Sequence, residues 1–303
     1  MARIFIDGDS GTTGLEIRER LAGRARLEIV SIAPEHRKDP QAKRRLLTEV
    51  DLAILCLPDD AAREVAALCD ALGDRAPRLL DASTAHRVAP GWVYGFAELT
   101  PDQPRKIAAA RRVANPGCYA TGAIALLAPL VAAGLIARDA PLTINAVSGY
   151  SGGGKKMIEV YEAGTAPPFE LYALGVEHKH LPEITTHAGL TRAPLFVPSV
   201  GNFRQGMLVS IPLWLDESPG RPKAADLEAA LVRHYAGSRW VKARPASGER
   251  LDATSLNGSN EMDLFVYAMK TNSQALLVAR LDNLGKGASG AAVQNLELML
   301  GAA

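Results

Sequence analysis

The chain has 303 residues, of which 48% are hydrophobic and 22% charged, proportions typical of a folded globular protein and unlike those of a disordered one. This length suits two ordinary domains or one large one. The 34 basic and 33 acidic side chains leave a formal net charge of +1, which argues against nucleic acid or an anionic membrane as the main partner.

Membrane insertion and export are also disfavoured. The longest apolar run, at 123–136, contains a proline and a glycine and is too short to cross a bilayer. An acid follows the first few residues, so we expect no signal peptide. The three cysteines cannot all pair and lack CxxC spacing, which predicts reduced thiols in the cytoplasm and no structural zinc site.

The first half of the chain alternates short apolar runs with helical stretches. We expect strands at 3–7, 26–32, 51–57, 78–81 and 111–114. Between them we expect helices at 12–22, 41–48, 60–72 and 101–110. Alternation at this spacing predicts an α/β domain with a parallel sheet and right-handed crossovers.

The second half has longer, alternating strands. These are expected at 142–148, 196–200, 206–215, 264–270 and 274–282, in an antiparallel or mixed sheet. Helices are expected at 120–133, 182–188 and 224–235. An amphipathic helix at 288–300 should pack back onto the first domain, so we predict a domain at 1–115 completed by 286–303, and a second at 116–285.

The first turn, DGDSGTTG at 7–14, resembles a dinucleotide-binding turn. A glycine at the strand exit permits a tight turn, the next lets the backbone approach a pyrophosphate, and the third lets the helix lie near the sheet. The spacing is GxxGxxG, not the commoner GxGxxG, so a glycine-rich turn without a ligand is the alternative. The candidate cofactor residues here are Gly8, Ser10, Gly11, Thr12, Thr13 and Gly14.

The residues after the second strand bear on the choice of cofactor. An acid there usually binds the ribose hydroxyls of NAD, whereas the 2′-phosphate of NADP needs cationic or hydroxyl partners. Ser31 and the basic run of His36, Arg37 and Lys38 favour NADP, and Glu35 opposes it. A solvated loop is the other interpretation.

Cys118 lies in the segment NPGCYATG at 115–122, directly before a strongly apolar helix. The Pro-Gly pair forces a turn and places the thiol at or just before the helix N-terminus. There, the helix dipole and N–H groups favour a thiolate and can hold an oxyanion. An inert buried cysteine is the alternative, and Cys56 and Cys69 fit that description.

The segment HKHLPE at 178–183 supplies two histidines before a helix that starts at a proline. No cysteine, acid or third histidine completes a metal site with them. We therefore expect His180 to transfer protons for a catalytic thiol, with Glu183 reaching back to hold its ring. His178 would point elsewhere if the segment is extended.

Two more clusters contain side chains suited to ligand binding, although each is also compatible with a solvent-exposed loop. Ser83 and Arg87 follow the strand at 78–81, at the end where open α/β sheets bind ligands. The stretch at 148–156, including Ser148 and Lys155, reads as a flexible loop suited to an anion.

The string VANPGCYATG at 113–122, with Pro129 downstream, resembles the active-site signature of the N-acetyl-gamma-glutamyl-phosphate reductase family. The resemblance covers nearly the whole chain, including 5–14, 148–155, 178–183 and the closing segment at 281–295. The compact length and the opening turn look like the shorter of the family's two forms.

The resemblance implies a Rossmann NADP-binding domain joined to an α+β catalytic and oligomerisation domain of the glyceraldehyde-phosphate-dehydrogenase type, assembled as a dimer or tetramer. It implies NADPH-dependent reduction of N-acetyl-glutamyl 5-phosphate to the 5-semialdehyde, in arginine biosynthesis. Cys118 would be the nucleophile and form a thioester, His180 the acid–base group with His178 nearby, and Glu183 its orienting residue. Ser83 would contact the cofactor and Asn283 would lie by the nicotinamide. The candidate substrate-binding residues are Arg87, Arg112, Asn115, Ser148 and Lys155.

Three other functions remain open at this point. The nearest alternative is another acyl-phosphate reductase of the same superfamily, such as aspartate-semialdehyde dehydrogenase or a carrier-linked aminoadipate enzyme. The motifs GCYAT at 117–121 and HKHLPE at 178–183 argue against the first of these. A cysteine hydrolase using Cys118 and His180 would leave the N-terminal turn without a ligand. A non-enzymatic dinucleotide sensor would leave the thiol and the histidine unexplained.

Overall fold

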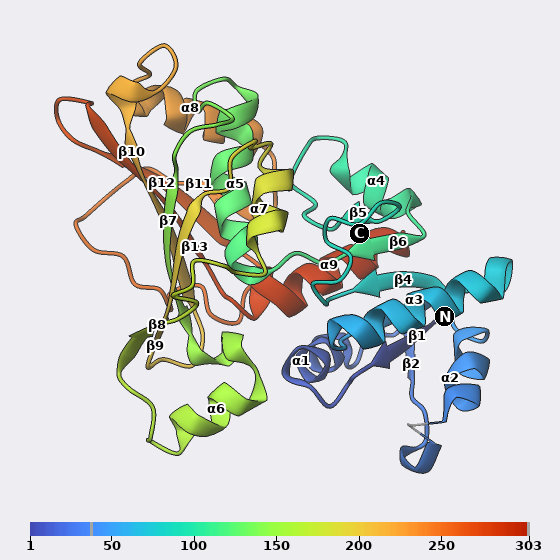
Figure 1. Ribbon diagram of the computed structural model, residues 1–303. Helices are drawn as coiled ribbons and strands as arrows, with labels where there is room; N and C mark the ends of the chain where they lie inside the picture. Colours follow the sequence, from blue (N-terminus) through green and yellow to red (C-terminus); the bar gives the residue numbers. More distant parts are fainter. Residues whose placement is uncertain (37–38, 302–303) are drawn as a thin grey trace. The chain divides into compact units, whose positions relative to one another are not determined.

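The computed structural model describes residues 1–36 and 39–301, and the chain divides into two compact units (Figure 1). Unit 1 contains Met1–Ala97, Asp102–Pro116 and Ala288–Ala303, and unit 2 contains Glu98–Pro101 and Gly117–Gly287. The main divisions thus fall at 116/117 and 287/288, against predicted boundaries at 115/116 and 285/286.

Unit 1 contains a six-stranded parallel sheet in the order β2-β1-β3-β4-β6-β5. The strands are β1 (Ala2–Asp7), β2 (Leu27–Val30), β3 (Leu52–Leu55), β4 (Arg78–Asp81), β5 (Val93–Tyr94) and β6 (Arg112–Ala114). This confirms the predicted parallel α/β architecture. The sequence analysis missed β5, which is too short to show a hydrophobic period.

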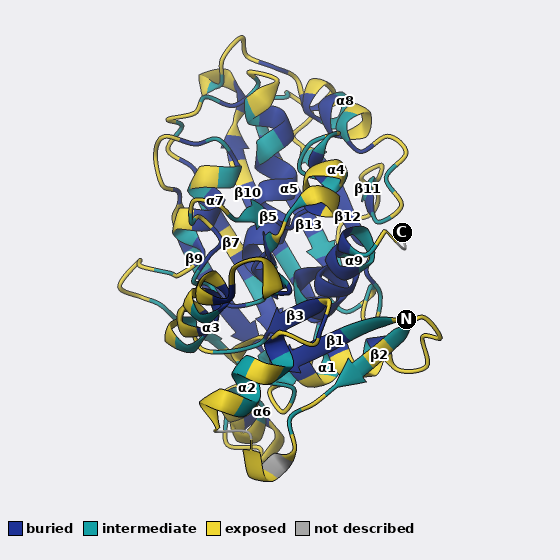
Figure 2. Cartoon of the chain, turned by 90° about the vertical axis from the view of Figure 1, so that its right-hand side faces the viewer, coloured by how far each residue is buried: buried dark blue, intermediate teal, exposed yellow. Residues whose placement is uncertain are grey.

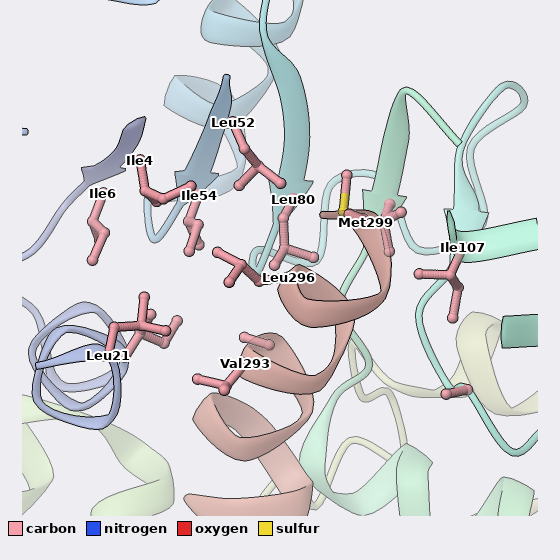
Figure 3. Packing of buried hydrophobic residues seen from close by; sticks show 14 residues of the cluster. Ile4, Ile6, Leu21, Leu52, Ile54, Leu80, Ile107, Val293, Leu296 and Met299 are labelled. Carbon is pink, nitrogen blue, oxygen red and sulfur yellow. The ribbon is translucent and has the colours of Figure 1, made fainter. Parts of the chain in front are cut away.

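Helices cover both faces of this sheet, and for that reason every residue of β3 is buried, as Figure 2 shows. They are α1 (Thr12–Leu21), α2 (Pro40–Leu47), α3 (Asp59–Leu72), α4 (Gln103–Ala109) and α9 (Gly290–Met299). On one face, Val293 and Leu296 of α9 pack with Ile4 and Ile54 of the sheet (Figure 3). The last helix is therefore part of the core of unit 1.

Unit 2 contains a mixed seven-stranded sheet in the order β11-β12-β13-β10-β7-β9-β8. The strands are β7 (Thr143–Gly149), β8 (Phe169–Leu171), β9 (Leu195–Gly201), β10 (Met207–Trp214), β11 (Val241–Ala243), β12 (Met262–Ala268) and β13 (Gln274–Leu281). The sequence analysis missed the two edge strands, β8 and β11. Each has three residues, too few for an alternating pattern to be recognised.

The helices of unit 2 are α5 (Cys118–Ala132), α6 (Lys155–Glu162), α7 (Leu181–His187) and α8 (Ala224–His234). Helix α5 packs on β10 and β13, with α7 and α8 beside it (Figure 1). Buried and more exposed residues alternate along β10. The buried side chains therefore lie on one face of the sheet and the more exposed ones on the opposite face. Among the helices described, none has the length and apolar character needed to cross a bilayer.

The expectation of a flexible loop at 148–156 was wrong. A short 3₁₀ turn at Tyr150–Gly153 follows β7, and α6 begins at Lys155. Gly154 takes φ +74° between them, a left-handed conformation that glycine adopts readily and that reverses the chain. Tyr150 stacks on Tyr161 of α6 with their ring centroids 4.9 Å apart, which anchors the helix on the turn.

Candidate active site

The turn between β1 and α1 shows separate roles for its three glycines. Gly8 has φ +91°, and a side chain there would collide with the carbonyl oxygen of Cys56, which directly follows the neighbouring strand β3. A side chain at Gly14 would collide with the carbonyl oxygen of Gly8, so α1 can lie close to the turn only with glycine there. At Gly11 an added Cβ would meet only one atom, at an ordinary 3.5 Å. Packing does not require Gly11, and its bare backbone suits the close approach of a phosphate.

Helix α1 begins directly after this turn. Gly11 is its N-cap, and no side chain caps the helix there. The first-turn N–H groups and the helix dipole favour an anion at this position, and the hydroxyl groups of Ser10, Thr12 and Thr13 lie in the same segment. The residues of the turn therefore fit the pyrophosphate of a dinucleotide.

Arg18 is a neighbour of Ser31 that the sequence analysis missed. It lies on α1, and its Nη1 donates to Ser31 Oγ at 3.1 Å and to Asp9 Oδ2 at 2.9 Å. The contact brings a guanidinium to the hydroxyl that the sequence analysis assigned to the 2′-phosphate. Arg18 lies one helical turn after Gly14, a spacing that could have indicated it.

The basic run after β2 is only partly described. Glu35 and His36 lie in a short 3₁₀ turn at Pro34–His36 and are exposed. Arg37 and Lys38, which we expected to bind the 2′-phosphate, lie outside the described residues.

At the carboxyl end of β4, Ser83 belongs to a buried cluster around Asp81. Its N–H and its hydroxyl donate to the two carboxylate oxygens of Asp81, at 2.9 and 2.7 Å. His86 Nδ1 lies 2.6 Å from the same carboxylate, and the imidazole stacks on Trp92. Ser83 thus lies at the ligand-binding end of the sheet and also holds the loop together.

Arg87 and Asn115 fix the chain just after β6. Arg87 Nε donates to the carbonyl oxygen of Asn115 at 3.0 Å. The Asn115 side chain donates to the carbonyl oxygen of Ala288 at 3.0 Å and accepts from Asn295 Nδ2 at 3.0 Å. Both residues are buried, and these bonds engage both ends of the Asn115 carboxamide in holding the chain.

Arg112 does not fit the substrate-binding role that we expected. It opens β6, at the amino end of the strand, whereas ligands of open α/β sheets bind beyond the carboxyl ends. Its guanidinium pairs with Asp70 of α3 and lies 5.7 Å from the ring centre of Trp92. This placement does not favour contact of Arg112 with the substrate, which stays a prediction.

Cys118 is the first residue of α5, which confirms its predicted place at a helix N-terminus. Gly117 is the N-cap, with no capping side chain, and its carbonyl oxygen accepts from the Thr121 hydroxyl at 2.9 Å. Cys118 is half-buried. At this position the N–H groups and dipole of α5 stabilise a thiolate and a nearby oxyanion.

Glu183 contacts the turn that carries Cys118. It lies in the first turn of α7 with 1% exposure, and its Oε1 accepts from the N–H of Gly117 at 2.8 Å. The two residues are 66 positions apart, so no sequence pattern indicated this bond. The predicted role of Glu183, holding the ring of His180, stays a prediction.

The two histidines lie together, because the chain turns between them and is not extended. Leu181 N–H donates to the His178 carbonyl oxygen at 2.9 Å, and His180 N–H donates to His178 Nδ1 at 3.1 Å. Their ring centroids are 4.7 Å apart, so the condition under which they would point different ways does not hold. As an acceptor, Nδ1 of His178 carries no proton in this arrangement.

Aromatic rings surround the histidines and link them to the start of α5. The Tyr119 ring lies 6.0 Å from both histidine rings, and Phe196 and Tyr172 lie 5.0 and 5.9 Å from that of His178. We call the following residues the cysteine cluster: Cys118, Tyr119, Tyr172, His178, His180 and Phe196.

Tyr119 and Tyr172 are members that the sequence analysis did not select. Burial is the main cause that raises the pKa of each phenol, and negative charge on Cys118 raises both pKa values further. The two hydroxyls therefore lie within electrostatic reach of the Cys118 sulfur and stay protonated at neutral pH. Tyr119 donates to the carbonyl oxygen of Ser199 at 2.9 Å.

Three further predicted residues of unit 2 differ in placement. Ser148 is buried, and its hydroxyl lies close enough to Tyr119 to lower the pKa of that phenol. Asn283 is buried as well, accepting from Gly206 N–H at 2.8 Å and donating to Ser151 Oγ at 2.9 Å. The Lys155 side chain is 79% exposed, 3.9 Å from Glu159. Contact of these residues with substrate or nicotinamide stays a prediction.

The other two cysteines have a different environment. Burial, and then the charge of Asp81, raises the pKa of Cys56 to about 12. Burial raises the pKa of Cys69 to about 11. Both remain thiols at neutral pH, as expected of inert residues.

Comparison with known proteins identifies relatives over the full chain. Residues 118–283 match the model of the semialdehyde dehydrogenase dimerisation domain. N-acetyl-gamma-glutamyl-phosphate reductase 2 of Pseudomonas putida is 53% identical, over 99% of this chain and 97% of that protein. The N-acetyl-gamma-glutamyl-phosphate reductases of Sinorhizobium medicae and Brucella suis are each 52% identical, over 99% of this chain and 99% of theirs.

Solved structures of similar fold include aspartate-semialdehyde dehydrogenases. That from Francisella tularensis has a TM-score of 0.74 at 11% identity, covering 99% of this chain and 100% of that one. Aspartate-semialdehyde dehydrogenase II from Vibrio cholerae has a TM-score of 0.71 at 14% identity, covering 99% and 98%. These identities establish a shared fold only, whereas the relatives at more than half identity establish the family. The chain belongs to the N-acetyl-gamma-glutamyl-phosphate reductase family.

Proposed function

We propose that this chain reduces N-acetyl-glutamyl 5-phosphate to N-acetyl-glutamate 5-semialdehyde with NADPH, releasing phosphate, as a step of arginine biosynthesis. The observation that carries the proposal is the position of Cys118 at the start of α5, in a cluster with His178 and His180. The names and full-length similarity of the relatives support the choice of substrate over that of aspartate-semialdehyde dehydrogenase.

In this proposal, the Cys118 thiolate attacks the acyl carbon of the substrate. The sulfur–carbon bond forms, the carbon–oxygen bond to phosphate breaks, and phosphate leaves with the electron pair, giving a thioester. Negative charge develops on the carbonyl oxygen, and the uncapped N-terminus of α5 supplies N–H groups for it.

His180 moves the protons. It accepts the Cys118 proton before attack and returns a proton to the sulfur when the product aldehyde leaves. A nicotinamide cofactor, when bound, supplies the hydride that reduces the thioester. The bond from Gly117 N–H to Glu183 holds the turn that carries the nucleophile. The buried phenol of Tyr119 and the partly buried phenol of Tyr172 keep water from the sulfur and stay neutral beside it.

For the cofactor, we infer NADP and not NAD. The cradle formed by Gly8, Gly11 and Gly14 fits a pyrophosphate, and Arg18 beside Ser31 adds a cation where a 2′-phosphate is expected. Helix α1 carries both the pyrophosphate turn and this guanidinium, so one rigid element would position them together.

We also propose that the protein is a cytoplasmic homo-oligomer that associates through the open face of the unit 2 sheet. Leu171 and Leu276 are exposed there and line a hollow with Tyr267, whose buried hydroxyl lacks a partner among the described residues. The match to a dimerisation domain supports association, and the three free cysteines support a reducing compartment. In sedimentation, Leu276→Asp should shift the protein towards monomer.

The deciding experiment follows NADPH absorbance in the presence of purified protein and a panel of acyl phosphates. We expect oxidation with N-acetyl-glutamyl phosphate and little with aspartyl phosphate or an aminoadipyl derivative. The reverse assay, NADP reduction by the semialdehyde, should require inorganic phosphate. Hydrolysis of the acyl phosphate at an equal rate without NADPH would instead support a cysteine hydrolase.

A further inference from the structure

A buried ion pair in unit 2 has no part in the chemistry described so far. Lys286 is 1% exposed, and its Nζ lies 2.9 and 2.7 Å from the two carboxylate oxygens of Glu98. The Glu98 side chain is 10% exposed. Glu98 opens the short segment Glu98–Pro101, and its carbonyl oxygen lies 3.0 Å from His234 Nε2 of α8. The backbone of Glu98 is thus held against α8 of unit 2.

Burying an ion pair costs hydration free energy that burying apolar side chains of the same size does not. Burial lowers the pKa of Lys286, and the Glu98 charge opposes that shift. Because two charges lose their hydration, replacing a buried pair with apolar side chains of similar volume is often neutral or stabilising. The location of this pair suggests that it serves a function and is not there mainly to stabilise the fold.

Lys286 lies in an unusual turn that rests on the nucleophile. Residues Gly285–Ser289 form a single π-helical turn, a feature frequent at functional sites. A Cβ added to Gly287 would lie 2.9 Å from Cys118 Cβ and 3.2 Å from Cys118 Cα. The backbone of residue 287 therefore touches Cys118 so closely that only glycine fits.

Two contacts hold this turn, one at Gly287 and one at the residue before it. Its own N–H donates to the Asp282 carbonyl oxygen at 2.9 Å, and the preceding residue is fixed by Glu98. On the opposite flank of Cys118, Gly117 N–H is bound by Glu183. Loss of the Lys286 anchor would let the wide turn relax and release the side chain of Cys118 from a single orientation.

We propose that the Glu98–Lys286 ion pair is a positioning device for Cys118, fixing the turn at 285–289 against the start of α5 and thereby setting the orientation and reactivity of the thiol. The proposal rests on the proposed function in that Cys118 is taken as the nucleophile. Glu98 and Lys286 are positioning residues in this proposal, since their effect reaches Cys118 through the neighbouring Gly287.

The test compares Lys286→Met, Glu98→Gln and the neutral double variant Glu98→Gln/Lys286→Gln with the unaltered full-length protein. The double variant leaves no lone buried charge, so it guards against loss of folding in the single variants. Asp263→Asn is the matched control, because Asp263 is buried and pairs with Arg244 and Arg280 on the unit 2 sheet. Gly287→Ala keeps the ion pair but places a methyl group against Cys118.

The main readout is the rate of Cys118 alkylation by iodoacetamide against pH, with the labelled site identified by mass spectrometry. We expect its midpoint to rise by about half a pH unit or more in the single variants, as the thiolate loses its fixed place at the helix N-terminus. For the acyl-phosphate reaction, kcat should fall about tenfold or more with KM little changed, because a small misplacement of a reacting group strongly lowers the rate. Gly287→Ala should show a similar rise in the alkylation midpoint and a similar fall in kcat. The double variant should lose less activity than the two single variants would lose if their effects were combined.

Asp263→Asn should lower Tm while leaving the alkylation profile and kcat unchanged. If the Lys286 and Glu98 variants behave in the same way, the pair is structural and the proposal fails. Alkylation needs neither substrate nor NADPH. Failure of the acyl-phosphate assay would therefore count against the proposed function and leave this test readable.

Discussion

The glycine-rich turn of unit 1 and the cysteine cluster of unit 2 are built in different ways. The turn is one continuous segment, residues 7–14, in which Gly14 packs on Gly8 and Gly8 packs on Cys56 just after β3. The cluster brings together the start of α5, Tyr172 after β8, the histidine turn and Phe196 of β9. One site depends on local backbone geometry, and the other depends on the packing of the whole unit.

This difference predicts how each site should fail. A substitution in the turn should change cofactor affinity and leave the thiol chemistry alone, because the turn needs few distant contacts. A substitution in the cluster should affect neighbours as well, because His180, His178 and Tyr119 are in mutual contact. The predictions below challenge that separation.

The largest effect is expected at the nucleophile. Cys118→Ser should reduce turnover by about 10³-fold or more, because a serine hydroxyl has almost no alkoxide at neutral pH. The NADPH dissociation constant, measured by fluorescence titration, should stay close to that of the unaltered protein. A large loss of NADPH binding would show that the two sites are not separable in this way.

The matched controls for that variant are Cys56→Ser and Cys69→Ser. The pKa values of these thiols are raised to about 12 and 11, so at mildly alkaline pH iodoacetamide should label Cys118 first. Because their thiolates form only at higher pH, their labelling in the folded protein should increase well above the usual thiol pKa. Equal labelling of all three would contradict this assignment.

The histidines give the next largest effect. His180→Asn should lower kcat by about 10²–10⁴-fold if it transfers the proton. His178→Asn should cost less, about tenfold, since His178 accepts the N–H of His180 and so positions its neighbour. Steady-state kinetics distinguish the two, and a larger kcat loss for His178→Asn would reverse the roles.

Two substitutions of Glu183 distinguish whether this residue anchors the turn at Gly117 or holds the ring of His180. A carboxamide can still accept from Gly117 N–H, so Glu183→Gln should be mild if the residue anchors the turn. Glu183→Ala removes the acceptor from a buried N–H and should cost about 1–3 kcal/mol of unfolding free energy together with a fall in kcat. If Gln proves as damaging in kcat as Ala, the negative charge itself is needed, as expected of a residue that holds His180.

The same contrast explains what could be predicted from the sequence. The turn at 7–14, the parallel sheet and the position of Cys118 follow from glycine spacing, strand–helix alternation and a Pro-Gly turn, which are all local signals. Strands of two or three residues, β5, β8 and β11, have no period to detect and exist through pairing with neighbours.

Tertiary contacts were the main gap at the sites. Tyr172, Glu98 and the Gly117–Glu183 bond join segments far apart in the sequence, so no pattern within one window indicates them. The place of Arg112 at the amino end of β6 likewise depends on strand direction in the folded sheet. Chemistry-bearing motifs are readable from sequence, while the residues that hold them in place are not.

The smallest predicted effect sharpens the cofactor assignment. Arg18 is partly exposed and already paired with Asp9, so part of its attraction for a 2′-phosphate is screened and part is offset by that pair. Arg18→Gln should therefore raise the dissociation constant of NADPH about fivefold to tenfold, just below the range for a charge-assisted bond. The constant for NADH should hardly change, since NADH lacks the 2′-phosphate that the guanidinium beside Ser31 would bind. Arg63→Gln, which breaks an exposed pair with Asp60 on α3, is the control and should affect the binding of neither ligand.

Calorimetric titration with 2′,5′-ADP and with AMP separates the contribution of the 2′-phosphate from that of the nicotinamide. An equal loss for both ligands would place Arg18 at the pyrophosphate or in the fold, and the preference for NADP would then have to come from Ser31 and the loop that follows it.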